Sequence, residues 1–337
     1  MKKIFNLIAS FVLLAGFSAC NKDGSDKPGL PPAPVPTVNY KGLTFISSGK
    51  STVCLAKVGA PDEITLEYST DESQWNPYTI GEKISMADGS FLLFRAGEQK
   101  NLTFSKGSDS YYHFEISGPV TAQGNIMSLL DRDFSTPLST NAFFALFEGC
   151  TSLLSAPELP ATTMEQGCYF RMFAECTGLK SAPELPAKEL AYNCYGWMFK
   201  GCSALTYVPD LPATEMVSYC YNNMFANCTS LKFAPELPAT RLDMGRYHCM
   251  FEGCTSLTSA PELPATELVS NCYEFMYKDC RNLRYVIGLF TTEPSEKTTK
   301  DWLSGVAASG TFIKSKKATW DVTSADGVPE GWKIETW

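Results

Sequence analysis

Residues 254–280, CTSLTSAPELPATELVSNCYEFMYKDC, decide the fold because this stretch recurs along the chain at a fixed step of 26 residues. A cysteine opens each copy, a leucine follows three residues later, and a Met-Phe or Met-Tyr pair precedes the next cysteine. The cysteines of this register are Cys150, Cys176, Cys202, Cys228, Cys254 and Cys280. Self-similarity at one period is typical of a repeat fold, in which each unit buries its apolar side against its neighbour. We therefore assign residues 141–290 to six 26-residue repeats.

Within one repeat, the sequence predicts an extended segment followed by a helix. Pro261 and Pro264 favour short extended backbone because proline removes donors from a strand ladder. Thr266 suits a helix N-cap, and apolar residues then recur every four positions up to Met276, which would give one apolar helix face. The residue before each register cysteine is Gly, Asn or Asp in five of six copies, types that tolerate the left-handed end of a helix. The expected fold is an α/β leucine-rich-repeat-type solenoid, curved because helices pack farther apart than strands.

The segments on either side of the repeats have a different composition. Residues 38–120 contain short alternating apolar runs separated by turn residues, which predicts a small all-β sandwich. Residues 121–140 would form an N-terminal cap. Residues 291–337 depart from the repeat and carry Trp302, Trp320 and Trp332, enough apolar mass to cover the end of the stack as a C-terminal cap.

The N-terminus is typical of an export signal. Lys2 and Lys3 precede an apolar stretch that is too short for a stable membrane span, and it ends at Phe17-Ser18-Ala19-Cys20. This ending resembles a bacterial lipobox and predicts a signal peptide at 1–19 with lipidation of Cys20; the alternative is ordinary cleavage beside an incidental cysteine. Residues 20–37 are rich in Pro and Gly and would form a tether. The lipid would be the membrane contact, with the chain anchored in the outer membrane and facing the exterior.

Charge and composition narrow the classes of function. The formal net charge is −8, and without residues 1–19 it becomes −10, since 26 basic residues then face 36 acidic ones. This balance disfavours nucleic acid as a partner. There are two histidines, and no nucleophile motif, metal cluster or acid pair stands out from the repeat. We therefore expect a protein that is not an enzyme and that needs no cofactor and no metal.

The pattern Cys-Tyr-x-x-Met-Phe-x-x-Cys-x-x-Leu-x-x-Ala-Pro-Glu-Leu-Pro-Ala-Thr resembles the 26-residue, BspA-like leucine-rich repeats of Bacteroidota surface lipoproteins. The resemblance covers about residues 141–290 and matches in many positions at once. It implies a surface role in adhesion or macromolecule binding, with a host or microbial protein or glycan as partner. The alternative is a lipoprotein that captures glycans for a nutrient-uptake system.

The repeated cysteines and tyrosines each allow more than one reading. The spacings of eight and eighteen residues between cysteines favour free thiols packed as small apolar residues, but inter-repeat disulfides and a metal site stay open. The tyrosines at Tyr169 and every 26 residues after it would be half-buried with their hydroxyls in water, or would stack sugars. An acidic row beginning at Glu158 would be a solvated edge or a Ca²⁺ site. Arg246 and Cys249 break the cysteine pattern in one repeat, which we attribute to local tolerance.

The candidate binding site comes from positions that vary while the repeat frame stays fixed. Positions free to differ between stacked units lie off the core, and aromatic and basic residues there are what binding surfaces favour. Two neighbouring positions meet this criterion, four and five residues after each register cysteine. The candidate ligand-binding residues are Lys180, Tyr207, Lys232, Phe233, Arg284 and Tyr285.

Overall fold

The structure is a computed structural model that describes residues 42–99, 102–321, 323–324 and 326–337. All of them belong to one compact unit, Thr37–Trp337. The predicted signal peptide, the tether and the lipidation site Cys20 lie outside the described residues.

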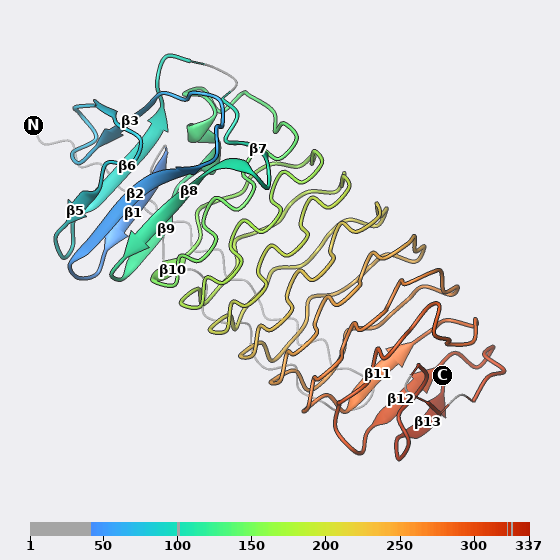
Figure 1. Cartoon of the computed structure of the whole chain (residues 1–337). Coiled ribbons are helices and arrows are strands. Elements are labelled where there is room, and N and C mark those ends of the chain that lie inside the picture. Colours follow the sequence, from blue (N-terminus) through green and yellow to red (C-terminus); the bar gives the residue numbers. More distant parts are fainter. Residues whose placement is uncertain (1–41, 100–101, 322, 325) are drawn as a thin grey trace, which may run out of the picture. The chain divides into compact units, whose positions relative to one another are not determined.

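Two sheets pack face to face at the N-terminal end of the described chain (Figure 1). The larger has the order β10-β9-β1-β6-β3-β4 and the smaller the order β5-β2-β8-β7. Phe45 on β1 lies 5.0 Å from Phe114 on β8, centroid to centroid, and Phe94 on β6 lies 5.6 Å from Phe114. The strands are β1 Leu43–Ser47, β2 Ser51–Val58, β3 Leu66–Ser69, β4 Asn76–Tyr78, β5 Ile84–Met86, β6 Phe91–Ala96, β7 Ser105–Gly107, β8 Ser110–Ser117, β9 Val120–Gln123 and β10 Leu153–Ser155.

The repeats contain no helix of the expected kind, so the α/β solenoid prediction is wrong. The helical element of the described residues is one 3₁₀ turn, η1 Ile126–Leu129, and the rest of the regular structure is strand. Each 26-residue unit, called a coil below, is closed by consecutive turns. We expected the stack to curve because helices pack farther apart than strands. Since the repeats contain no helices, that reason for curvature no longer applies.

Left-handed residues explain why the four-residue pattern does not give a helix. In each coil three residues, four positions apart, have φ between 53° and 76°. In five consecutive coils they are Gly167, Arg171 and Glu175; Asn193, Trp197 and Gly201; Tyr219, Asn223 and Asn227; Gly245, Cys249 and Gly253; and Asn271, Phe275 and Asp279. A left-handed residue at every fourth position interrupts the helical backbone, while the apolar side chains keep the four-residue spacing of a helix face. The left-handed backbone expected before the register cysteines is present, but it closes a turn rather than a helix.

Backbone hydrogen bonds alternate between bonds within a coil and bonds to the next coil. The N–H of Phe173 donates to the carbonyl of Met198 in the next coil at 2.9 Å. The N–H of Ala174 donates to the carbonyl of Arg171 in its own coil at 3.0 Å. The N–H of Glu175 then donates to a carbonyl of the next coil. The same alternation recurs in each following coil, so the turns are joined into a continuous ladder.

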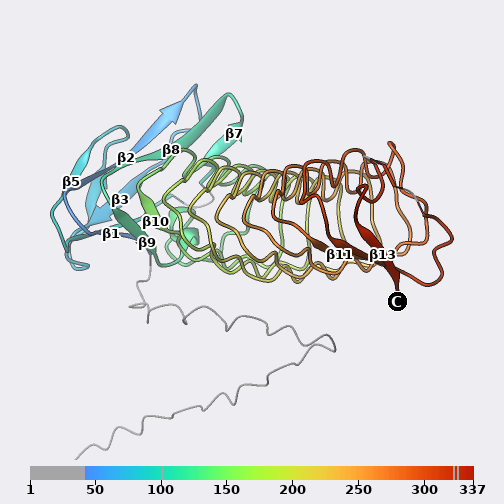
Figure 2. The same ribbon diagram turned by 90° about the horizontal axis from the view of Figure 1, so that it is seen from below.

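The extended halves of the coils stack in the same direction. Parallel bridges join Ser181 to Tyr207, Phe233 to Ser259 and Ser259 to Tyr285. A three-stranded parallel sheet follows at the C-terminal end, formed by β11 Tyr285–Gly288, β12 Thr311–Lys314 and β13 Lys333–Thr336. Figure 2 shows the coils arranged one behind another between β10 and β11.

The interior of the stack consists of columns of identical side chains. From Phe147 to Tyr277 the rings of one column stack with centroids 5.3–5.7 Å apart. The tyrosines from Tyr169 to Tyr273 form a second column, 5.9–6.2 Å apart. Each tyrosine of this second column is at most 2% exposed, so both the half-buried reading and the sugar-stacking reading are wrong. The hydroxyls of Tyr169, Tyr195 and Tyr221 have no hydrogen-bond partner within the described chain.

The register cysteines form a third column and are all buried, as predicted. The Cys150 thiol donates to the carbonyl of Phe114 on β8 at 3.0 Å, and the other five donate to a carbonyl of the preceding coil. For Cys176 the acceptor is Phe147, at 3.0 Å from the sulfur, and for Cys202 it is Phe173, at 3.1 Å. Burial raises the pKa of the Cys150 and Cys254 thiols to about 12. A protonated thiol can keep this hydrogen bond, whereas a thiolate would lose both the bond and its solvation.

Replacing Tyr195 separates the contribution of the ring from that of the hydroxyl. Tyr195→Phe keeps the stacked ring and removes a hydroxyl that no protein group satisfies, so we expect a free energy of unfolding equal to or above that of the wild type. Tyr195→Ala leaves a cavity and should lower it by about 3–5 kcal/mol. Urea unfolding of both variants measures the difference, and a large loss in Tyr195→Phe would contradict this account.

The thiol column predicts how the cysteines react. At pH 8 the native protein should take up alkylating reagent slowly, because its thiols are buried and protonated. After denaturation without reductant, most of the twelve cysteines other than Cys20 should be labelled, as counted by mass spectrometry. Labelling of only one or two would show that disulfides join the coils.

Candidate functional site

The structure places the predicted binding residues on one side of the coils, in two adjacent lines that follow the stack. We call them the extended-edge column: Lys180, Tyr207, Lys232, Phe233, Arg284 and Tyr285. In one line, parallel bridges join Ser181 to Tyr207, Phe233 to Ser259 and Ser259 to Tyr285. In the other, the N–H of Thr206 donates to the carbonyl of Lys180 at 3.0 Å and the N–H of Arg284 donates to the carbonyl of Thr258 at 3.0 Å. The predicted grouping is therefore present, although Ser259 separates Phe233 from Tyr285.

The side chains of the extended-edge column reach solvent to different degrees. Phe233 is 48% exposed, which is unusual for a phenylalanine, while Tyr207 and Tyr285 are partly exposed. The three basic residues of the column are exposed. An exposed ring beside cations is the composition expected of a contact surface.

An acidic row runs beside the aromatic line. Its members are exposed or partly exposed: Glu158, Glu184, Asp210, Glu236 and Glu262. The pKa of Tyr207 is raised, first by partial burial and then by the carboxylates of Glu184 and Asp210, which places these carboxylates near its hydroxyl. Basic, aromatic and acidic lines thus lie side by side along the stack.

The irregular repeat brings His248 and Cys249 together, which sequence reasoning did not expect. The sulfur of Cys249 lies 3.8 Å from Nε2 of His248, Glu274 lies 3.5 Å from the same nitrogen, and Nδ1 faces Asn222 at 3.0 Å. Burial raises the pKa of the Cys249 thiol, and Glu252 raises it further. Burial also lowers the pKa of His248, against the carboxylates of Glu274 and Glu252. The pair is a neutral thiol beside a neutral imidazole and not an activated nucleophile.

A second set of surface residues was missed. They lie on the turn half of each coil, at the middle left-handed residue and at the positions one before and three after it. These positions vary from coil to coil as strongly as the extended-edge column, and that variation was readable in the sequence. They went unnoticed because a helix was expected there.

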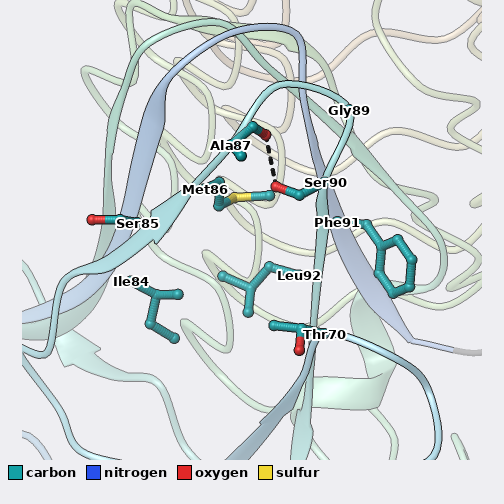
Figure 3. A pocket seen from close by; sticks show the side chains of 9 residues that line it. All are labelled: Thr70, Ile84, Ser85, Met86, Ala87, Gly89, Ser90, Phe91 and Leu92. Carbon is teal, nitrogen blue, oxygen red and sulfur yellow. Dashed lines mark hydrogen bonds between the residues drawn. The ribbon is translucent and has the colours of Figure 1, made fainter.

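Two hollows of the described residues lie away from both surfaces. One is lined by Thr70, Ile84, Met86, Ser90 and Leu92 beside β5 and β6, and Figure 3 shows its side chains. No ionisable side chain lines it, and the hydroxyl of Ser90 is engaged by the carbonyl of Ala87 at 2.7 Å. A second hollow is lined by residues 97–99 with Arg132 and Asp133. The first can hold an apolar group, but it offers no acid, base or nucleophile.

The described residues show neither a metal site nor a membrane-spanning helix. Across residues 42–99, 102–321, 323–324 and 326–337, no three His, Cys, Asp or Glu side chains gather as metal ligands. The same residues hold no helix with the length and apolar character to cross a bilayer. Comparison of the chain with family models, curated proteins and solved structures finds no significant match.

Proposed function

We propose that this chain is an exported, lipid-anchored protein that binds a macromolecular partner and does not catalyse a reaction. The observation that carries the proposal is the register of the extended-edge column. Backbone bridges between coils join Ser181 to Tyr207, Phe233 to Ser259 and Ser259 to Tyr285, and Phe233 is 48% exposed. Rigid backbone beneath exposed rings lowers the entropy cost of binding, because the contact residues are already placed.

The absence of catalysis is supported by the chemistry of the most reactive cluster. The thiol of Cys249 is held protonated by burial and by acidic neighbours, which is the reverse of what a cysteine nucleophile needs. Adhesion to a host or microbial protein or glycan is the form of binding that the sequence resemblance favours. Capture of glycans for uptake is the second candidate, and the acidic row favours it, since carboxylates accept hydrogen bonds from sugar hydroxyls.

The binding surface can be tested with Phe233→Ala and a matched control. A glycan array beside an array of extracellular host proteins identifies ligands of the wild-type protein. Phe233→Ala should then weaken binding to at least one of them by about 1–3 kcal/mol, as expected for a hot spot, with Tm nearly unchanged. Met244→Ala is the control, because Met244 is 50% exposed but lies outside the column. A large loss of Tm with intact binding would place Phe233 in the core and remove this site.

The anchor is tested separately with Cys20→Ala. Loss of the lipidated thiol should move the protein from the membrane fraction to the soluble fraction, because the acyl chains would be its membrane contact. Cys54→Ala, which changes a buried cysteine of β2, should leave the fractionation as in the wild type. Unchanged membrane association of Cys20→Ala would contradict the lipid anchor.

A further inference from the structure

The middle left-handed position carries, in all but one of five consecutive coils, a side chain that does not suit its backbone. The first and last left-handed positions are mostly Gly, Asn or Asp, residues that adopt positive φ readily. The middle position instead holds, coil by coil, Arg171, Trp197, Asn223, Cys249 and Phe275. Trp197 has φ 59° and Phe275 has φ 55°.

Large side chains at this left-handed position lower the stability of the fold. A left-handed residue other than glycine is disfavoured by about 1–2 kcal/mol, and bulky side chains are rare there. Burial in the core could compensate, but the side chains of Trp197 and Phe275 are only partly buried. The backbone ladder requires the left-handed conformation at this position, but it does not require an aromatic side chain there. A bulky ring at a strained, partly exposed position, where glycine would be less strained, points to contact with something outside the chain.

Each ring makes a cation–π contact with the lysine three residues later in the same coil. The ammonium of Lys200 lies 3.9 Å from the centroid of the Trp197 ring, and that of Lys278 lies 4.9 Å from the centroid of Phe275. Each pair combines an apolar ring with a hydrogen-bond donor. The same arrangement in two coils, on strained backbone in both, makes a chance pairing of surface residues a poor explanation.

A polar segment lies between the two ring–lysine pairs. Asn222 accepts from Asn223 at 2.7 Å and contacts His248 at 3.0 Å, and His248 in turn faces Glu274. Three coil steps separate Trp197 from Phe275, and each step is 5.6–5.7 Å in the stacked rings beneath. The result is a line of side chains with an aromatic ring at each end and amide, imidazole and carboxylate groups in the middle.

We propose that this line binds a neutral glycan chain that lies along the stack. We call it the turn strip, formed by Trp197, Lys200, Asn222, His248, Phe275 and Lys278. The rings contact the apolar faces of sugar residues, and the planar polar side chains between them exchange hydrogen bonds with the hydroxyls. The site shares no residue with the extended-edge column and does not depend on the function proposed for it.

Two observations favour a glycan over a protein partner. Protein hot spots insert anchor side chains into pockets, and neither of the two hollows described above includes a residue of the turn strip. The turn strip and its neighbour Glu274 also carry charges of both signs, with Lys200 and Lys278 against the rings and the carboxylate of Glu274 beside His248. A surface of mixed charge does not select a ligand of one charge, which suits an uncharged, hydroxyl-rich chain.

Affinity gel electrophoresis of the purified protein tests the proposal. The probes are four soluble neutral polysaccharides, an α-glucan, a β-glucan, a mannan and a xylan, with polygalacturonate as the anionic comparison. We expect at least one neutral polysaccharide to retard the wild-type protein. Trp197→Gly and Phe275→Gly should each weaken that binding about tenfold or more, while Tm stays equal or rises because glycine relieves the left-handed backbone.

Asp301→Gly is the matched control, since Asp301 is a left-handed residue with φ 48° that lies 26 residues after Phe275, in the C-terminal segment and outside the turn strip. It should leave binding unchanged. The proposal is overturned if none of the four neutral polysaccharides retards the wild type, if polygalacturonate alone does so, or if the two glycine variants bind as the wild type does. It is also overturned if Trp197→Gly lowers Tm as a core substitution would. Phe233→Ala should not affect this binding, so failure here is distinguishable from failure of the extended-edge column.

Discussion

The hydrogen bonds between coils are the interaction on which the rest of this structure depends. Alternate backbone N–H groups of the turn half leave their own coil and donate to the next, as Phe173 does to Met198. A helix would have used those donors internally. The left-handed residue at every fourth position turns them outward, so the conformational cost of positive φ is offset by a backbone bond to the neighbouring coil. The ladder then fixes the register of every side-chain column.

Register explains why both candidate surfaces are linear. When backbone bonds align equivalent residues of successive coils, outward positions form lines along the stack, and inward positions form the buried columns of Phe, Tyr and Cys. The extended-edge column and the turn strip lie on different halves of each coil. The first is held by parallel bridges, such as that between Phe233 and Ser259, and the second by the turn ladder. Each surface can therefore change its side chains without disturbing the other.

The sequence predicted the period, the burial of the cysteines and the surface position of Phe233, because these follow from which residues recur and which vary. The helix prediction was wrong because apolar residues at every fourth position occur both on a helix face and in consecutive four-residue turns. Gly and Asn before the register cysteines signalled left-handed backbone, but Trp197 and Phe275 gave the opposite signal, since aromatic residues disfavour that conformation. The turn strip was missed because a helix was expected over these residues, although their variation from coil to coil was readable in the sequence.

The irregular coil shows how much of the fold is carried by backbone. Arg246 stands where the neighbouring repeats carry their second cysteine, and it is only 7% exposed. The ladder between coils nevertheless continues here, since the N–H of Tyr247 donates to the carbonyl of Cys272 at 3.2 Å. Its guanidinium reaches the carbonyl of Arg241 at 3.1 Å and the carboxylate of Asp243 at 3.0 Å, which satisfies much of the buried charge locally. An interior column that accepts arginine in place of cysteine cannot be what sets the register. Because the backbone sets it, outward side chains such as Trp197 are free to be chosen for contact rather than for folding.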